Sequence, residues 1–391
     1  MPWKDTRPSA RDPNMPRFRH KVDPTLLARL TDAHCHPTDD DAFDADVLRG
    51  LKTGKLCAMS SSLSNQEKTK EVHSASPSAV IPFFGVHPWF CHPISFAPSG
   101  NLPSKEEHYT SLFPSPTDPS QPHPHLERVM SSFPDPISDP ISAADFTSRL
   151  EADLLAFPSS HVGEVGLDRA FRIPNPPHIA ANKSNPKNTE LATPLEHQLK
   201  VLEAQVDVAI KLGRSVSFHS VRAPQETVDV LKRLKAEKAG WGSIHVCLHS
   251  FGGSAETAKQ IQKAHPNTFF SFATIISGRS PHFHNLLRAI EPNRLLAESD
   301  FSDTAEIDNQ IWDLLEELEI ALGWSPSHSV EVLEANWKRF ITPPSERPPV
   351  PVTNRQKKRE RKRVDMYVSE DEEGEGRRVG EKEKEKEVGE T

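Results

Sequence analysis

The chain has 391 residues, 36 of them proline, and a formal net charge of −8 at pH 7. This length suits one large α/β barrel with additions as well as it suits two domains. The negative charge excludes a general attraction to nucleic acid, so any affinity for phosphate must come from a local site.

Short apolar segments alternate with amphipathic segments along most of the chain. The pattern predicts strands at 29–34, 55–60, 79–86, 161–166, 214–219, 243–249, 268–275 and 294–299. The three- to four-residue spacing of apolar side chains predicts helices at 195–212, 225–238, 255–264, 283–290, 305–322 and about 327–341. Between the first three strands the pattern defines no helix. Eight strands with helices between most of them predict an α/β fold, a TIM-like (β/α)₈ barrel.

Proline-rich insertions at about 93–145 and 171–194 interrupt this pattern. They are polar and lack apolar periodicity, so we expect long loops that bury too little surface to offset their ordering entropy. Proline clusters at 343–351 and the chain is densely charged from about residue 354, which predicts a disordered charged tail over 342–391. The expected organisation is an N-terminal extension (1–28), a hydrolase barrel (29–341) and this tail.

The four cysteines form no CxxC motif, and Cys35 and Cys247 lie inside predicted strands. We therefore expect a reducing compartment inside the cell. We expect no membrane association, since no apolar run approaches transmembrane length and the N-terminus lacks a secretory apolar segment. The basic run 357–363 is typical of a solubilising tail, a nuclear localisation signal or a phosphate-binding patch. The predicted location is the cytoplasm, the nucleus or both.

Six potential metal ligands follow the predicted strands: His34, His36, Glu164, His219, His249 and Asp300. Parallel barrel strands present their C-terminal ends at one rim, so we expect these side chains to converge. His34 and His36 are separated by one residue and therefore point to the same side of their strand. A single histidine after a strand is more often a hydrogen-bonded core group. The shared strand context of all six residues is what predicts a metal site.

Six ligands exceed the three or four that one ion would take, so we predict two divalent ions. Imidazoles favour Zn²⁺ or Mn²⁺, whereas carboxylates also admit harder ions such as Mg²⁺. Glu164 can bridge two ions because a carboxylate has two oxygens. Asp300 is expected to bind one ion and to accept a proton from the attacking water. These residues predict a metal-dependent hydrolase with Glu164 and Asp300 as its catalytic carboxylates.

Several sequence strings together resemble the TatD family of metal-dependent deoxyribonucleases. They are Asp32–His36, Gly85–Trp89, Gly163–Asp168, Phe218–Ser220, Leu248–Gly253, Glu298–Asp300 and the closing segment Asn336–Phe340. The resemblance covers residues 29–341 outside the two insertions. It implies a barrel of the amidohydrolase type that binds two divalent ions and cleaves phosphodiester bonds of DNA.

The resemblance also implies a role for each site residue. It assigns one ion to His34, His36, Glu164 and Asp300, and the other to Glu164, His219 and His249. It places His87 opposite the substrate phosphate. The insertions and the tail resemble a fungal branch of the family that is described as interacting with a subunit of the anaphase-promoting complex. A helical-repeat protein partner is therefore expected beside the DNA substrate.

The chain departs from the family pattern near two of these ligands. The Leu-Asp that follows the first pair of histidines in the family is replaced by Pro37–Thr38. The arginine two residues after His219 is replaced by Val221, and Arg222 follows one residue later. Neither change removes a ligand. We expect His87 and Arg222 to contact the substrate.

Two other functions are compatible with the sequence. One is an adapter, a cell-cycle complex partner, whose barrel binds another protein through the insertions or the tail. The six intact ligands argue against binding as the sole role. The other is a small-molecule amidohydrolase, but the bridging lysine of many such barrels has no candidate in this chain. A divalent-metal deoxyribonuclease is the main prediction.

Overall fold

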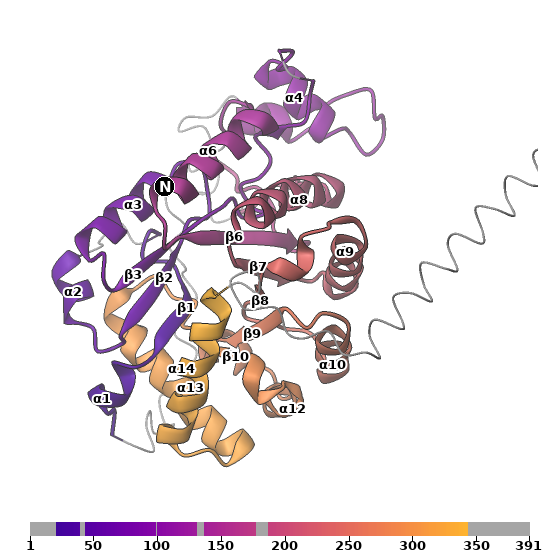
Figure 1. Cartoon of the computed structure of the whole chain (residues 1–391). Coiled ribbons are helices and arrows are strands. Elements are labelled where there is room, and N and C mark those ends of the chain that lie inside the picture. The colour runs from indigo at the N-terminus through magenta and orange to yellow at the C-terminus, as the bar shows by residue number, and fades with distance from the viewer. Residues whose placement is uncertain (1–20, 40–43, 99, 131–136, 177–186, 343–391) are drawn as a thin grey trace, which may run out of the picture. The chain divides into compact units, whose positions relative to one another are not determined.

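The computed structural model describes residues 21–39, 44–98, 100–130, 137–176 and 187–342. Most of the predicted N-terminal extension and the predicted tail lie outside these residues, so both remain predictions. Within the described part, eight strands form one sheet, and Figure 1 shows this sheet in the middle with helices around it. In these described residues no helix combines the length and the apolar character needed to cross a membrane.

All eight barrel strands are parallel and pair in their order along the chain. They are β1 (Thr31–Cys35), β2 (Lys55–Met59), β3 (Val80–Phe84), β6 (His161–Asp168), β7 (Val216–Val221), β8 (Val246–Leu248), β9 (Thr268–Phe272) and β10 (Leu295–Ala297). The chain after β10 returns to β1, since the Asp300 amide donates to the His34 carbonyl at 2.9 Å. The His36 amide likewise donates to the Phe301 carbonyl at 2.8 Å. This nearly closed barrel confirms the predicted fold.

Helices connect the strands on the outside of the barrel. They are α2 (Ala45–Gly50), α3 (Gln66–Ala75), α6 (Ala143–Ala156), α8 (Leu195–Leu212), α9 (Pro224–Glu237), α10 (Ala255–Ala264), α12 (Phe283–Ala289), α13 (Ile307–Leu322) and α14 (Pro326–Ile341). Shorter helical turns are α1 (Pro24–Leu27), α11 (Thr274–Ser277) and three 3₁₀ turns, Trp241–Ser243, Pro292–Arg294 and Thr304–Glu306. The predicted helices are confirmed within two residues at each end. Helices α2 and α3 lie between the first three strands, where the sequence pattern defines no helix.

Helix α8 shows how the sequence sets such an element. Leu202, Val206 and Ala209 are buried at helical spacing on the face toward the barrel. The helix ends at Gly213, whose φ of 65° lies in the left-handed region. The Gly213 amide donates to the carbonyls of the last turn, and glycine adopts this conformation without a steric penalty. An apolar stripe and a terminal glycine therefore define both the face and the end of the helix.

The strands are buried on both faces, as expected for a parallel barrel covered by helices. In β2, Leu56 and Ala58 pack toward the helices, whereas Cys57 and Met59 belong to a separate cluster inside the barrel. That inner cluster consists of Ala33, Cys57, Met59, Ile81, Phe83, Cys247, Phe269, Leu296, Trp337 and Phe340. The barrel is thus a packed core rather than a channel.

Helix α14 closes one end of this core. The Ser215 hydroxyl donates to the Phe340 carbonyl at 2.7 Å, and the Asn336 side chain donates to the Leu295 carbonyl at 2.8 Å. Ser215 and Leu295 stand at the starts of β7 and β10. The covered end is therefore the N-terminal end of the strands, and the predicted ligands lie at the opposite rim.

The expectation of a long loop is wrong for the described part of the first insertion, whereas the described residues of the second form no helix or strand beyond an isolated bridge between Pro174 and Asn188. The first contains β4 (Ile94–Ser95) paired with β5 (Ile141–Ser142), and helices α4 (Lys105–Leu112) and α5 (Leu126–Met130). Its last predicted residues already belong to α6. Figure 1 shows α4 beyond α6, to one side of the barrel.

The two insertions pack together around a small apolar core of their own. Its buried members are Tyr109, Phe113, Leu126, Val129, Ile137, Ile173 and Leu191. Ile173 and Leu191 are also joined by a backbone hydrogen bond of 2.9 Å. We call the described residues between 94 and 142 and between 171 and 193 the insertion lobe. Each insertion buries its few apolar side chains against the other, which the composition of either one does not reveal.

Candidate metal centre

The six predicted ligands meet at the C-terminal rim of the barrel, around the carboxylate of Glu164. Its Oε2 atom lies 3.3 Å from His36 Nε2 and 3.6 Å from His34 Nε2. Asp300 Oδ1 lies 3.4 Å from the same His36 nitrogen and 3.8 Å from that of His34. Two imidazoles and two carboxylates therefore surround one position on this side of Glu164.

The other oxygen of Glu164 faces a second group of imidazoles. Its Oε1 atom lies 2.7 Å from His219 Nδ1 and 2.7 Å from His249 Nε2. His219 and His249 come from the ends of neighbouring strands, and these two nitrogens are 3.2 Å apart. Glu164 thus stands between two donor groups, with one carboxylate oxygen toward each.

Glycines allow the strands to approach closely at this point. Gly166, in β6, has a φ of 152°, and a Cβ atom there would lie 2.0 Å from the His219 carbonyl oxygen. At Gly85 a Cβ atom would lie 2.9 Å from the backbone of Gly163. A side chain at either position would force the strand that carries Glu164 away from its neighbours. The glycines next to Glu164 therefore help to place its carboxylate.

Three residues beyond the strand ends have left-handed backbone conformations. They are Arg222 (φ 51°), Ser250 (φ 41°) and Asp300 (φ 49°), after β7, β8 and β10. Non-glycine residues rarely adopt such angles, and those that do concentrate at functional sites. At Asp300 the hydrogen bond from the backbone amide to the His34 carbonyl fixes the conformation. The backbone strain lies at the rim where the ligands converge.

Asp168 orients His219, a role that the sequence analysis did not assign. Its Oδ2 atom lies 3.2 Å from His219 Nε2 and accepts a 2.6 Å hydrogen bond from Trp89 Nε1. Burial raises the pKa of Asp168, but the hydrogen bond and charge of His219 outweigh it and bring the pKa to about 2. An ionised Asp168 keeps the proton of His219 on Nε2, which leaves Nδ1 free to bind a cation. Its position at the end of β6, four residues after Glu164, is the feature of the sequence that could have identified it as a site residue.

Asp32 supports His34 in a similar way and was also missed. Its Oδ1 atom accepts from the His34 amide at 3.1 Å and from the Ser299 amide at 2.9 Å. The His34 Nδ1 atom contacts the Ser217 hydroxyl at 2.8 Å. This buried carboxylate ties the first strand to the chain after the last strand, so that His34 and Asp300 lie side by side.

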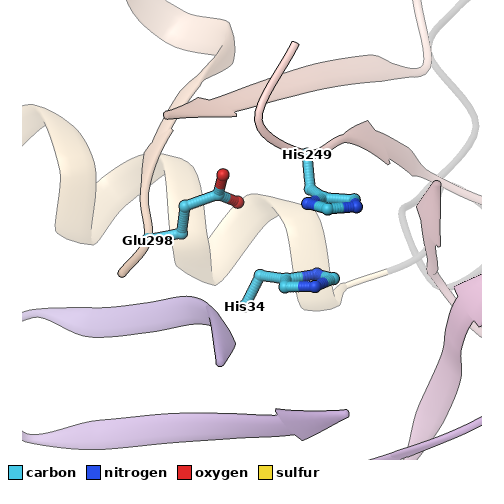
Figure 2. A group of neighbouring side chains, drawn as sticks. All are labelled: His34, His249 and Glu298. Carbon is cyan, nitrogen blue, oxygen red and sulfur yellow. The ribbon is translucent and has the colours of Figure 1, made fainter. Parts of the chain in front are cut away.

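Glu298 is a third buried carboxylate beside the ligands. In Figure 2 the His34 and His249 rings lie parallel, with Glu298 next to them; the ring centroids are 3.7 Å apart. Glu298 Oε1 accepts from both the amide and the hydroxyl of Ser250 at 2.7 Å, and Oε2 accepts from Ser271. Burial raises the pKa of Glu298 to about 7. With both oxygens occupied by donors, Glu298 acts on the site through Ser250.

The donor set fits divalent cations. Within the described residues, ligand atoms of His34, His36 and Asp300 lie within 4.8 Å of one another, and so do those of His87, Glu164 and His219. Neutral imidazole nitrogens and carboxylate oxygens are suitable ligands for Zn²⁺ or Mn²⁺.

The charges of the site also fit cations. Burial opposes protonation of His36 and His219, yet the neighbouring carboxylates raise their pKa to about 10 and about 9. Burial opposes ionisation of Glu164 as well, but the surrounding histidines hold its pKa well below its usual range. The carboxylates thus attract positive charge, which a cation supplies when it replaces these protons.

His87 also faces Glu164, but its hydrogen bonds argue against a ligand role. Its Nδ1 atom accepts from the Trp89 amide at 3.1 Å, so the ring proton belongs on Nε2. That Nε2 lies 3.4 Å from Glu164 Oε1. We therefore assign the second donor group to His219 and His249, and His87 remains a predicted substrate contact. Arg222, the other one, is exposed directly after β7.

The sequence matches the model of the TatD related DNase family over residues 31–342. The chain belongs to this family. The match spans the barrel and confirms the resemblance predicted from the sequence. Together with the donor cluster, the match also confirms the prediction of a metal-dependent hydrolase of the deoxyribonuclease type.

Curated proteins from two yeasts and from human are similar to this chain. The chain is 28% identical to the Cut9-interacting protein scn1 of Schizosaccharomyces pombe, over 81% of this chain and 99% of that protein. It is also 28% identical to an uncharacterized deoxyribonuclease of Saccharomyces cerevisiae, over 70% of this chain and 84% of that protein. Deoxyribonuclease TATDN3 of Homo sapiens is 24% identical over 73% of this chain and 83% of its own length.

Solved TatD structures share the fold. A TatD homologue from Escherichia coli superposes with a TM-score of 0.52 at 16% identity, covering 81% of this chain and 98% of the other. A TatD family hydrolase from Entamoeba histolytica gives a TM-score of 0.53 at 13% identity, covering 80% and 97%. At this level of identity the likeness supports the barrel architecture alone.

Proposed function

We propose that this protein hydrolyses phosphodiester bonds of DNA with two divalent ions, one on each side of Glu164. The observation that carries the proposal is the orientation of the Glu164 carboxylate. Its Oε2 atom faces His34 and His36, and its Oε1 atom faces His219 and His249. A carboxylate between two donor groups is the arrangement by which proteins bridge paired ions.

One ion would be held by His34, His36, Glu164 and Asp300, and the other by Glu164, His219 and His249. Four imidazoles favour Zn²⁺ or Mn²⁺, while the two carboxylates also accept Mg²⁺. When bound, such ions supply Lewis acidity and raise the acidity of water at neutral pH. Asp168 and Asp32 hold the ligands in place through His219 and the His34 backbone.

Asp300 is the proposed proton acceptor. Burial raises its pKa, but the hydrogen bond from His36 and the nearby imidazoles hold it below its usual value, so the group is ionised at neutral pH. Its Oδ2 atom lies 3.2 Å from the Ser250 hydroxyl oxygen, whose proton is shared with Glu298. We assign His87 and Arg222 to the substrate phosphate, His87 through its Nε2–H.

Metal analysis of the purified protein tests the bridging role. We expect about two divalent ions per chain. Glu164→Gln should lower the occupancy of both positions, because a neutral amide bridges two cations poorly. Glu331→Gln, an exposed substitution on α14, is the matched control and should keep both ions. Unchanged stoichiometry in Glu164→Gln would remove the bridge from the proposal.

A nuclease assay with Mg²⁺, Mn²⁺ and Zn²⁺ in turn tests the activity. We expect cleavage of a DNA oligonucleotide with at least one of these ions, and none after chelation. A fully loaded protein that cleaves no DNA under any of the three would overturn the deoxyribonuclease assignment. The same series identifies the ion that supports the reaction.

A second proposed role is binding to a helical-repeat protein, in the cytoplasm or the nucleus. The identity to scn1, a relative named for its interaction with Cut9, favours this role, since the alignment covers 99% of that protein. Co-purification of the full chain and of a chain lacking residues 354–391 with a purified helical-repeat partner tests it. Absence of binding in both would leave hydrolysis as the sole role.

A further inference from the structure

Three aromatic side chains form a partly exposed ledge beside the metal centre. Trp89 and Phe171 stack with ring centroids 4.8 Å apart and an angle of 13°. The Phe90 ring lies 6.3 Å from Trp89 and 6.4 Å from Phe171, and Phe90 is 36% exposed. Trp89 and Phe171 are half-buried. We call Trp89, Phe90 and Phe171 the aromatic ledge.

The aromatic ledge is attached to the metal centre through Asp168. Trp89 Nε1 donates to Asp168 Oδ2 at 2.6 Å, and this same oxygen contacts His219. The other carboxylate oxygen accepts from the amides of Ala170 and Phe171 at 2.6 Å and 3.0 Å. One carboxylate thus fixes a proposed metal ligand together with both stacked rings. The ledge has a defined position relative to the reacting centre.

The aromatic ledge also borders the predicted phosphate contacts. The Trp89 ring lies edge-on to His87, with centroids 4.8 Å apart. The Arg169 amide, two residues before Phe171, donates to the Val221 carbonyl, next to the exposed Arg222. A phosphate held at the centre would therefore have flat apolar rings on one side. Such rings stack on the face of any nucleobase and need no particular base sequence.

Packing of the insertion lobe accounts for part of the ledge. Phe171 contacts the apolar core of the lobe at its edge, so one of its faces has a structural role. Packing does not account for the exposure of Phe90, whose ring lies next to both stacked rings and 6.4 Å from that of His87.

We propose that the aromatic ledge is a subsite that stacks a nucleobase adjacent to the scissile phosphate. The inference rests on the proposed phosphodiester hydrolysis and assigns specificity for nucleic acid to Phe90 and Phe171. Residue Phe171 belongs to the second insertion, so this subsite gives the insertion lobe a part in substrate selection.

The test compares two oligonucleotides of equal length, one with normal bases and one with abasic residues throughout. Both carry the same phosphates, so they differ only in the bases, and the Leu variants then isolate the contribution of stacking. Phe90→Leu and Phe171→Leu keep apolar volume and remove the flat ring. We expect each variant to raise KM for the normal oligonucleotide roughly tenfold, the typical loss of one base-stacking contact. KM for the abasic oligonucleotide and kcat for both should stay unchanged.

Phe96→Leu is the matched control, because Phe96 is an exposed lobe aromatic outside the ledge. It should change neither KM. Equal increases in KM for both oligonucleotides in the ledge variants would show a structural role and overturn the proposal. Unchanged KM for the normal oligonucleotide would overturn it as well.

The experiment distinguishes an error in the proposed subsite from an error in the proposed hydrolysis. If the loaded wild-type protein cleaves neither oligonucleotide, the proposed function fails, and binding is then measured by fluorescence anisotropy. A preference for the normal oligonucleotide that disappears in Phe90→Leu and Phe171→Leu supports the subsite. Equal binding of both oligonucleotides by the wild type contradicts it.

Discussion

The rim of the barrel and the insertion lobe are built from the chain in opposite ways. At the rim each ligand lies within a barrel strand or shortly after one, and the strand itself carries the residue to the centre. In the lobe the apolar core joins Tyr109 and Phe113 to Ile173 and Leu191, across α6 and the whole of β6. The rim is local in sequence at every position, whereas the lobe exists only through contacts between distant segments.

This difference shows when amino-acid composition gives a wrong prediction of structure. The insertions are polar and rich in proline, so their average predicts loops. Each contributes only a few apolar side chains, yet together these bury one another. One local signal was present, the capping box of Ser104 and Glu107 at the start of α4. A short core needs few residues when two segments share it.

Asp300→Asn tests the rim most strongly. We expect hydrolysis to fall by about 10²-fold or more, because the variant loses both a ligand and the proposed proton acceptor. The fold should persist, since the backbone amide of residue 300 still donates a hydrogen bond to the His34 carbonyl. Steady-state DNA cleavage and circular dichroism check these two outcomes. Asp139→Asn, an exposed lobe substitution, is the control, and wild-type cleavage by Asp300→Asn would refute the mechanism.

Leu191→Ala tests whether the lobe has a core of its own. Leu191 is 1% exposed, so its truncation should destabilise the lobe by about 2–5 kcal/mol. Hydrogen exchange should increase at α4 and α5 and stay unchanged in the barrel strands. Leu296→Ala, inside the barrel, should instead raise exchange throughout the strands. A uniform increase from Leu191→Ala would mean that lobe and barrel unfold as one unit.

The dependence of stability on pH tests the contact between the lobe and α8. Three histidines, His92, His108 and His197, are neutral there. Burial lowers the pKa of His92 to about 3, and the pKa values of His108 and His197 are lowered too. The unfolded chain therefore binds protons first, and stability present above pH 6.5 is lost as pH falls toward 3.

We expect His92 alone to lower the free energy of unfolding by about 2 kcal/mol when the pH falls from 6.5 to 5. Urea unfolding at both pH values gives this quantity, and His92→Gln should reduce the difference by that amount. An identical pH dependence in wild type and variant would mean that His92 is protonated in the folded state.

Deletion of residues 354–391 should have the smallest effect. The segment lies outside the described residues, and its sequence offers no core-forming pattern, so we expect unchanged melting temperature and metal content. Thermal unfolding and metal analysis of the shortened chain measure both. A melting temperature several degrees lower would show that this segment docks on the barrel.

The sequence by itself determined the barrel and the order of its ligands. Apolar runs of strand length, helical stripes such as that of α8, and polar residues at strand ends are all local patterns. A parallel barrel converts such patterns directly into one site, because all its strands end at the same rim. His34, His36, Glu164, His219, His249 and Asp300 were therefore predictable as a group.

Only the tertiary structure decided how that group is held and what lies beside it. Asp168 orients His219 on the neighbouring strand, and Asp32 ties Ser299, next to the ligand Asp300, to the first strand; no spacing in the sequence encodes those two pairs. The aromatic ledge brings Trp89 and Phe90 against Phe171, some 80 positions later. The insertion lobe likewise depends on two segments that are unremarkable when read alone. Such contacts depend on where the barrel places the ends of its strands, so their partners are set by the fold rather than by neighbours in sequence.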